Sequence, residues 1–450
     1  MERVRSDNLI VGLGATGQSV ARYLLARGMS FAVTDTRSEP PACDDPELAR
    51  ILNERRVGPL DGLDATGLRR LIVSPGVALE HPAIAAAGEA GAEITGDIDL
   101  FAREAAAPVI AITGSNGKST VTALTGELLD AAGYAVAIGG NYGTPALDLL
   151  ERDPEMFVLE LSSFQLERCH DLAPAAAVVL NLSPDHLDRY ADMAAYLRAK
   201  QRVFRGAARG LVNRDDPMLA DMPTPPAMQR ETFGLQAPPS ATDWGLCPGV
   251  HEDGPQFCRG DQALLATARL RLRGHHNWAN ALAALGLVWP WLDAPERRAR
   301  ALAALADFPG LPHRSQWIAS IDGVDWINDS KGTNLGATMA ALRGTPGPLV
   351  LIAGGQAKGQ DFSPLADQLA GKVRGAVLLG EDAPLISRAL SPVVPVRHVA
   401  DMDAAVASAA EWAQPGDSVL LSPACASLDM YPDYRARGDD FARAVRERAA

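Results

Sequence analysis

The sequence predicts an α/β protein built from doubly wound, mostly parallel sheets. Short apolar runs that end in Gly or Asp alternate with Ala- and Leu-rich stretches from one end of the chain to the other, a pattern typical of parallel strands joined by helices. The length of 450 residues exceeds what one hydrophobic core usually supports, so two or three domains are expected. Apolar residues make up 47% of the chain and charged residues 22%, which excludes wholesale disorder.

The predicted strands fall into three blocks. The first block ends near Gly96, and its apolar runs are 8–12, 31–35 and 71–74. The second block has a glycine loop followed by a helix over 121–132, and its strands are 109–112, 157–160 and 177–181. The later two are apolar throughout, as expected for strands covered on both faces.

The second block continues into a segment of different composition. Residues 224–256 are rich in Pro and Gly and are interpreted as surface loops and weak edge strands. A helix is predicted over 276–287, and a Pro- and Gly-rich turn is predicted after it at 309–312. The third block is predicted to be another doubly wound sheet, with strands at 324–328, 349–353, 376–380 and 418–422.

The charge and the cysteines narrow the class of protein. A formal charge of -13 argues against nucleic-acid binding, which needs a basic face. No apolar run approaches the length of a membrane span, so a cytoplasmic protein without membrane insertion is expected. Neither a zinc site nor a disulfide framework is predicted, because no CxxC pair occurs among Cys43, Cys169, Cys247, Cys258 and Cys425.

The first motif is a glycine loop at residues 12–17 (GLGATG). It follows a predicted strand and opens a helix, where glycines let backbone amides approach a phosphate. Asp35 ends the next strand, where a dinucleotide enzyme would bind a ribose hydroxyl. A lone glycine loop of this kind is weak evidence, so NAD, another nucleotide and a purely structural turn all remain open.

The strongest motif is residues 113–120 (TGSNGKST), between a strand and a helix. It is a variant phosphate-binding loop, because Ile112 stands where the usual pattern has its first Gly. The physical requirements are still met: backbone amides at a helix N-terminus, the Lys118 cation, and the Ser119 or Thr120 hydroxyl for Mg²⁺.

Two carboxylate-bearing segments end later strands of the same block. Glu160 ends one strand and could hold Mg²⁺ in the ligand crevice. His186 lies beside Asp185 after the next strand, and either metal binding or loop packing would explain it. By its pattern alone Lys200 is an ordinary helical surface lysine, and the polar residues 275–280 are an ordinary helix start.

The third block has polar clusters after three of its strands. Residues 328–334 (NDSKGTN) combine opposite charges with hydroxyls, which suits a phosphate and a ribose together or a solvated turn. The segments at 354–358 and 422–429 could each hold a carboxylate.

These blocks, in this order, resemble the Mur ligases, and among them the members that add D-glutamate. The resemblance runs end to end and rests on 12–17, 74–76, 96–101, 113–120, 139–141, 159–165, 185–189, 276–280, 311–314, 328–334 and 421–427. It implies three domains: a Rossmann-like one at 1–96 that binds a UDP substrate, a P-loop ATPase-like one at 97–310, and a Rossmann-like one at 311–450 that closes over ATP and binds glutamate.

The resemblance also implies a role for each site residue. Those implied to bind ATP are Gly114, Ser115, Asn116, Gly117, Lys118, Ser119, Thr120, Asn277, Asn280, Arg314, Asp329 and Lys331. Those implied to bind the UDP substrate are Ala15, Thr16, Asp35, Thr36, Arg37, Ser74, Asn141 and His186. Those implied to bind glutamate are Thr333, Lys358, Ser427, Leu428 and Tyr434. Two Mg²⁺ ions would be held by Ser119, Glu160, His186 and Lys200, with Lys200 carbamylated.

The implied reaction joins D-glutamate to UDP-N-acetylmuramoyl-L-alanine in cytoplasmic peptidoglycan precursor synthesis, by a monomer that uses ATP. The substrate carboxylate would become an acyl phosphate, which the glutamate amine then attacks. Lys118, Glu160, His186 and Lys200 are the expected catalytic residues, and catalysis would rest on positioning and charge neutralisation.

Three positions depart from the pattern of this family: Gly332 replaces Ala, Tyr434 replaces Phe and Gln316 replaces Glu. The first two are conservative, and the third affects only local hinge contacts. The alternatives are a folylpolyglutamate synthetase-like ligase, which normally lacks a separate UDP domain, and an NAD-dependent oxidoreductase, which leaves Lys118 unexplained. A non-enzymatic nucleotide sensor would not need Glu160, His186 and Lys200. The sequence leaves the stereochemistry of glutamate open.

Overall fold

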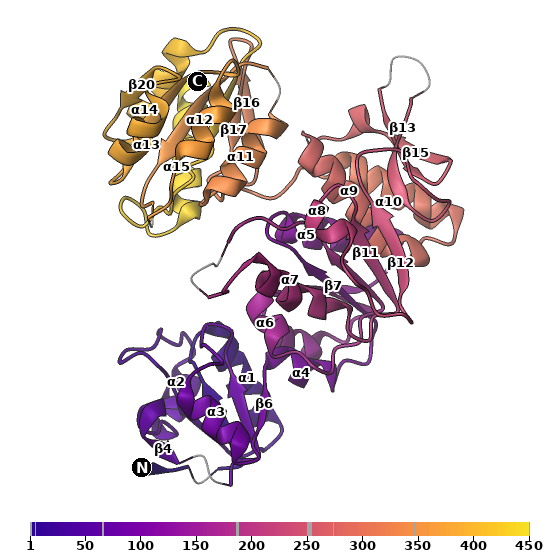
Figure 1. The fold of residues 1–450 in the computed structure, drawn as a ribbon, viewed down its shortest axis with the longest axis vertical. Helices are drawn as coiled ribbons and strands as arrows, with labels where there is room; N and C mark the ends of the chain where they lie inside the picture. Colours follow the sequence, from indigo (N-terminus) through magenta and orange to yellow (C-terminus); the bar gives the residue numbers. More distant parts are fainter. Residues whose placement is uncertain are drawn as a thin grey trace. The chain divides into compact units, whose positions relative to one another are not determined.

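The computed structural model describes residues 2–4, 6–64, 67–185, 189–249, 254–272, 274–345, 347–357 and 359–449. The chain forms two compact units. The first contains Met1–Gly245, Arg259–Asp261 and Ala283–Ala301, and the second contains Leu246–Cys258, Gln262–Leu282 and Leu302–Ala450. Figure 1 shows helices alternating with strands along most of the described chain. No helix in the described part of the chain is long and apolar enough to cross a membrane.

The first sheet has the strand order β3-β2-β5-β6, and all its pairs are parallel. Its strands are β2 (Asn8–Val11), β3 (Phe31–Thr34), β5 (Arg70–Val73) and β6 (Glu93–Thr95), and its helices are α1 (Ala15–Ala26), α2 (Pro46–Glu54) and α3 (Pro82–Glu89). A short ladder joins β1 (Glu2–Arg3) to β4 (Leu63–Asp64). The chain leaves β2 for β3 on one side and later places β5 on the other. Ligands of open α/β sheets bind in a crevice at such a reversal, which here falls at the carboxyl ends of β2 and β5.

The central sheet has the order β15-β14-β13-β12-β11-β10-β7-β9-β8. Its strands are β7 (Val109–Thr113), β8 (Val136–Gly140), β9 (Met156–Glu160), β10 (Ala176–Val179), β11 (Arg209–Asn213), β12 (Gln229–Phe233), β13 (Trp244–Cys247), β14 (Gln256–Arg259) and β15 (Gln262–Ala266). Strand β7 lies between β9 and β10 and is parallel to both. The loop after β7 therefore emerges from an interior strand, the third from the β8 edge of the sheet.

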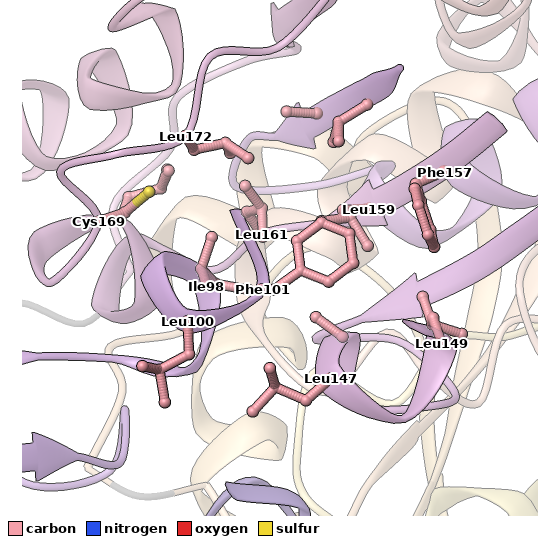
Figure 2. Packing of buried hydrophobic residues seen from close by; sticks show 14 of the residues in the cluster. Ile98, Leu100, Phe101, Leu147, Leu149, Phe157, Leu159, Leu161, Cys169 and Leu172 are labelled. Carbon is pink, nitrogen blue, oxygen red and sulfur yellow. The ribbon is translucent and has the colours of Figure 1, made fainter. Parts of the chain in front are cut away.

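The α-helices of this region and one of its 3-10 helices alternate with its strands or follow them. They are α4 (Asp97–Ala102), α5 (Lys118–Ala132), α6 (Ser163–Glu167), α7 (Met193–Gln201), α8 (Pro217–Ala220), α9 (His275–Val288), α10 (Pro295–Asp307) and the 3-10 turn η2 (Ala146–Arg152). Figure 2 shows part of the core that they enclose, where Phe101 of α4 meets Phe157 of β9. The two rings are edge to face, with centroids 4.9 Å apart. Burial of such apolar side chains is the main stabilising contribution here.

The third sheet has the order β16-β17-β21-β18-β19-β20. Its strands are β16 (Gln316–Ile321), β17 (Val324–Asn328), β18 (Leu349–Gly354), β19 (Val373–Leu379), β20 (Val396–His398) and β21 (Ser418–Leu421). Its helices are α11 (Leu335–Gly344), α12 (Ser363–Leu369), α13 (Ala383–Leu390), α14 (Met402–Trp412) and α15 (Tyr434–Ala449). Separate apolar clusters fill its two faces, one under α11, α12 and α13 and the other under α14 and α15. This confirms the doubly wound prediction, although neither the antiparallel edge strand β16 nor the opposite edge strand β20 was predicted.

Four expectations need correction. Helix α5 begins at Lys118 and not at Val121, because Gly117 can adopt the left-handed conformation that starts the helix early. Residues 224–256 are not only loops and edges, since β12 pairs with β11 on one side and β13 on the other. Lys200 is on a helix but is buried, with an exposed fraction of 1%.

The fourth correction concerns the cysteines. Cys247 and Cys258 form a disulfide, with Cα atoms 6.1 Å apart. They lie in β13 and β14, which are neighbours in the sheet. Pairing across adjacent strands leaves no short spacing motif, so a search for CxxC could not find it.

Candidate active site

The phosphate-binding loop lies between β7 and α5, and its backbone needs two glycines. Gly114 has φ +155 and Gly117 has φ +82, and a Cβ on Gly114 would lie 2.9 Å from Cβ of Leu180. Lys118 is the first residue of α5, and its Nζ donates to the carbonyl oxygens of Gly114 and Ser115, both at 2.9 Å. The ammonium therefore lies over the loop at a helix N-terminus, where backbone N–H groups favour an anion.

The segment after β10 holds this loop in place. The side chain of Asn181 accepts from the backbone N of Asn116 at 2.8 Å and donates to its carbonyl oxygen at 3.0 Å. The Ser115 hydroxyl accepts from the backbone N of Ser183 at 3.0 Å, and the Asn116 amide donates to the Ser183 hydroxyl at 3.1 Å. The loop is thus preorganised by hydrogen bonds of the protein itself.

A carboxylate and a hydroxyl meet beside the loop. The Ser119 hydroxyl donates to Glu160 Oε2 at 2.6 Å, and the Asn141 side chain donates to Oε1 at 2.8 Å. Glu160 ends β9 and is 3% exposed. Carboxylate and hydroxyl oxygens at the end of a parallel strand are the donors that Mg²⁺ prefers, so these residues fit that ion. Within the described ranges, no three His, Cys, Asp or Glu side chains gather into a metal-binding group.

Lys200 lies against the same loop from α7. Its Nζ donates to the Gly114 carbonyl oxygen at 2.8 Å and lies 4.5 Å from the centre of the Tyr196 ring. Burial, followed by the nearby charge of Lys118, holds the pKa of Lys200 well below its usual value. The Tyr196 hydroxyl lies 3.3 Å from Ser115 Oγ. Sequence patterns did not single out Tyr196, because a tyrosine inside a helix carries no signal. His186 lies outside the described residues.

The glycine loop after β2 lies against the Ser74 turn after β5. The Ser74 hydroxyl donates to the Gly12 carbonyl oxygen at 2.9 Å. A Cβ on Gly17 would lie 1.9 Å from that carbonyl oxygen, so only glycine fits there. Ala15 and Thr16 open α1, and Ala15 is exposed. The structure therefore places Ala15, Thr16 and Ser74, three of the predicted substrate-binding residues, near the carboxyl ends of β2 and β5.

The Asp35 carboxylate accepts hydrogen bonds from nearby residues of the first sheet region. It accepts from the Leu13 backbone N at 2.6 Å and from Nε and Nη2 of Arg37, both at 2.8 Å. Burial raises the pKa of Asp35, but the hydrogen bonds from Arg37 and Leu13 outweigh it and lower the pKa to about 2. Thr36 and Arg37 are exposed. Both carboxylate oxygens of Asp35 thus accept hydrogen bonds from its own segment.

The third sheet has its own polar cluster after β17. Asp329 accepts from the Ser315 backbone N at 3.0 Å and from the Ser422 hydroxyl at 2.7 Å. Burial raises the pKa of Asp329 to about 6, although these donors and Arg314 oppose the shift. Lys331 Nζ lies 4.1 Å from the centre of the Tyr434 ring. The structure thus brings Asp329 together with Arg314, and Lys331 together with Tyr434.

The remaining predicted residues vary in exposure. Ser427 is 3% exposed, whereas Leu428 is 63% exposed. Thr333 lies between β17 and α11. Asn277 and Asn280 lie in α9, where the Asn280 amide donates to Asn277 Oδ1 at 3.2 Å. Lys358 lies outside the described residues.

A buried arginine in α15 was missed by sequence patterns. Arg437 is 2% exposed, and its guanidinium donates to backbone oxygens of Ser330, Gly354, Cys425 and Ala426 at 2.9–3.3 Å. These residues end or follow β17, β18 and β21, so one side chain ties together three loops of the third sheet. An arginine in an Ala/Arg-rich helix resembles a solvated residue, and no local signal distinguishes it.

The sequence was compared with models of known protein families. The model of the Mur ligase middle domain matches residues 112–288, that of the MurD-like N-terminal domain of Mur ligases matches residues 6–96, and that of the glutamate ligase domain of Mur ligases matches residues 313–425. The chain belongs to the Mur ligase family.

Two relatives are similar over their whole length. A UDP-N-acetylmuramoylalanine--D-glutamate ligase from Nitrosococcus oceani is 49% identical, with 99% of this chain and 97% of that protein aligned. One from Pseudomonas aeruginosa is also 49% identical and covers 100% of both.

Solved structures agree with this fold. A MurF ligase from Thermotoga maritima in complex with ADP matches with a TM-score of 0.59 and 16% identity, over 99% of this chain and 96% of that one. A UDP-N-acetylmuramate-alanine ligase, MurC, from the same organism matches with a TM-score of 0.57 and 18% identity, over 99% of this chain and 100% of the other. At these identities the likeness shows the fold alone.

Proposed function

We propose that this chain ligates D-glutamate to UDP-N-acetylmuramoyl-L-alanine with ATP, through an acyl phosphate, in cytoplasmic peptidoglycan precursor synthesis. The observation that carries the proposal is the cluster of Lys118, Ser119, Glu160 and Asn141 around the loop after β7, in a chain 49% identical to ligases with this name over their full length. An oxidoreductase would leave this cluster without a use.

The chemistry asks the protein to position its substrates and to neutralise charge. The alanine carboxylate attacks the γ-phosphorus of ATP, the bond to the bridging oxygen breaks, and ADP leaves. The glutamate amine then attacks the acyl carbon of the acyl phosphate and expels phosphate. Lys118 and the backbone amides of the loop stabilise the negative charge on the phosphates.

Metal ions complete the proposed ATP site. Mg²⁺ would neutralise phosphate charge, and Ser119 and Glu160 are the residues that would hold the first ion. For a second ion we propose His186 and carbamylated Lys200. The carbamate is supported by the environment of Lys200, since only a neutral amine reacts with CO₂ and burial lowers the pKa of this lysine.

We assign the substrates to the three blocks of the chain. Residues 1–96 would bind the UDP substrate through Ala15, Thr16, Asp35, Thr36, Arg37 and Ser74, with Asn141 and His186 from the second block. Residues 97–310 would bind ATP with Asn277 and Asn280, aided by Arg314, Asp329 and Lys331 of the block 311–450. That last block would bind glutamate through Thr333, Lys358, Ser427, Leu428 and Tyr434. We propose that the enzyme acts as a monomer.

An ADP-release assay tests this function. With UDP-N-acetylmuramoyl-L-alanine and Mg²⁺ present, D-glutamate should stimulate ADP release and L-glutamate should not. Lys118→Ala should lower kcat by at least about a hundredfold in a folded protein, because the developing charge on the phosphates loses its cation. ADP release that depends on neither substrate, or that proceeds normally in Lys118→Ala, would contradict the proposal.

A further inference from the structure

One arginine is buried at a position that the proposed reaction leaves without a role. Arg168 directly follows α6, and its side chain is 1% exposed. Its Nη1 donates to the Phe164 carbonyl oxygen and its Nη2 to the Val77 carbonyl oxygen. The Glu167 carboxylate is 3.5 Å away, farther than in a charge-assisted hydrogen bond. A guanidinium removed from water and bonded mainly to backbone carbonyls carries a desolvation cost, and its pKa falls to about 10 for that reason.

Val77 belongs to a turn that packs on the glycine loop. The Val77 backbone N donates to the Ser74 carbonyl oxygen at 3.0 Å, which closes the turn. A Cβ added to Gly12 would lie 2.8 Å from Cβ of Ser74 and 3.3 Å from Cγ2 of Val77. The turn is therefore in van der Waals contact with the glycine loop, and a displacement of Val77 would alter the crevice between β2 and β5.

The chain between the first and the central sheet also passes Arg168. A Cβ on Gly96 would lie 3.1 Å from Cβ of Arg168. Gly96 is the residue before α4, so the stem of the arginine packs against the connection while its guanidinium reaches the Val77 turn. Both contacts lie within the first compact unit.

We propose that Arg168 is a positioning residue for the UDP substrate: it ties the end of α6 to the Ser74–Val77 turn and so holds that turn against the glycine loop. The proposal rests on the proposed function, which assigns the UDP substrate to this crevice. The guanidinium is too deeply buried to touch the substrate itself. Arginine suits this task because its planar fork donates in two fixed directions at once, which lysine does not.

A salt bridge between the same two regions offers a control, although its arginine is 40% exposed and not buried. Arg22 of α1 bonds Asp148 of η2 at 2.5 Å, and Ser19 donates to the same carboxylate at 2.8 Å. This contact also joins the first sheet region to the central one, but it does not involve the Ser74–Val77 turn. If Arg168 merely fastens the two regions together, Arg22→Met and Arg168→Met should behave alike.

The test measures binding and kinetics separately. Calorimetry should show UDP-N-acetylmuramoyl-L-alanine binding about tenfold more weakly to Arg168→Met than to wild type, as expected for loss of a charged hydrogen bond. Its KM should rise by a similar factor, while kcat and the KM values for ATP and glutamate stay within about twofold. The affinity of Arg168→Lys for the UDP substrate should lie between those of wild type and Arg168→Met. Arg22→Met should bind the UDP substrate as tightly as wild type does.

Three outcomes would overturn the proposal: unchanged affinity in Arg168→Met, an equal rise of all three KM values, or an equally large effect of Arg22→Met. Circular dichroism checks folding, and if Arg168→Met does not fold then Arg168→Lys decides, with wild-type affinity as the contrary result. Failure of the proposed function is distinguishable. If wild type binds the UDP substrate without releasing ADP, the proposed function fails and the affinities of the variants still test Arg168. If wild type does not bind the UDP substrate, both proposals are overturned.

Discussion

At the scale of single residues, Lys200 shows how burial changes the chemistry of a side chain. Its sequence context is that of a solvated lysine on a helix, yet its Nζ lies 2.8 Å from the Gly114 carbonyl oxygen and only 1% of the residue is exposed. Burial and the charge of Lys118 favour the neutral amine. A lysine in this state can act as a nucleophile toward CO₂, which a solvated ammonium cannot.

The first prediction concerns this lysine. Lys200→Ala should lower kcat by at least about a hundredfold, because an anionic metal ligand would be lost. A short carboxylate such as acetate, supplied in solution, should restore part of the activity by filling the space. Lys372→Ala is the control, because Lys372 also donates to backbone carbonyl oxygens. The Lys372→Ala enzyme should keep wild-type activity and show no response to acetate. Full activity of Lys200→Ala would remove the proposed second metal site.

The second prediction concerns the pH dependence of stability. The folded-state pKa of Asp35 is about 2, below its usual value, so its ionised form is favoured by folding. The stabilisation is present above about pH 4 and is lost as the pH falls to about 2. We expect it to contribute about 1–2 kcal/mol to the free energy of unfolding, because Arg37 is half exposed and solvent weakens its interaction with Asp35. Urea midpoints of wild type and Asp35→Asn should differ at pH 6 and converge toward pH 2. A difference between the two urea midpoints that does not change with pH would contradict the assigned pKa.

At the scale of elements, the start of α1 shows why local propensity does not decide every position. Gly17 lies within α1, where alanine is favoured over glycine by about 1 kcal/mol. Its backbone does not need glycine, since its φ is not positive. The constraint is the Gly12 carbonyl oxygen, which would be 1.9 Å from an added Cβ. Close packing of the loop on the helix therefore outweighs helix propensity.

The third prediction follows from this contact. Gly17→Ala should lower the free energy of unfolding by about 2 kcal/mol or more, because the loop must move to admit the methyl group. It should also raise the KM for the UDP substrate. Gly14→Ala is the matched stability control, since nothing lies within 4 Å of a Cβ there, and its thermal midpoint should stay near that of wild type. Equal thermal midpoints for the two variants would refute the steric argument.

At the scale of the whole molecule, polar residues follow parallel strands in each of the three sheets. Gly12 and Ser74 follow β2 and β5, the phosphate-binding loop follows β7, and Asp329 follows β17. Each cluster lies at carboxyl strand ends, where open α/β sheets bind their ligands. One fold principle, used three times, gives the chain three places to hold the three proposed substrates.

The fourth prediction tests this division of labour. Lys358→Ala should raise the KM for glutamate steeply while changing the KM for the UDP substrate little, because a carboxylate would lose its cation. Lys358 lies outside the described residues, so this assignment rests on the family resemblance. Arg37→Ala should do the reverse, since Arg37 lies beside Asp35 in the first sheet region. Both KM values, measured for both variants, decide the matter: if the two variants weaken the same substrate, the assignment of substrates to separate blocks is wrong.

The fold class, the strands β7 and β9 and the glycine loop after β7 could all be predicted from the sequence. The apolar run 109–112, the glycines that follow it and Lys118 are contiguous in the chain, so their pattern predicted a strand, a loop and a helix, as the structure shows. The position of Glu160 at the end of an apolar strand was predicted for the same reason, and the structure confirms that position. Periodicity, turn residues and strand ends depend on residues close together in the chain, so they can be predicted from the sequence.

Which distant side chains come into contact depends on the tertiary structure. The contact of Lys200 with Gly114 spans 86 residues, that of Arg168 with Val77 spans 91, and that of Arg437 with Ser330 spans 107. Burial and long-range pairing follow from how sheets and helices pack, and no window of sequence contains both partners of such a contact.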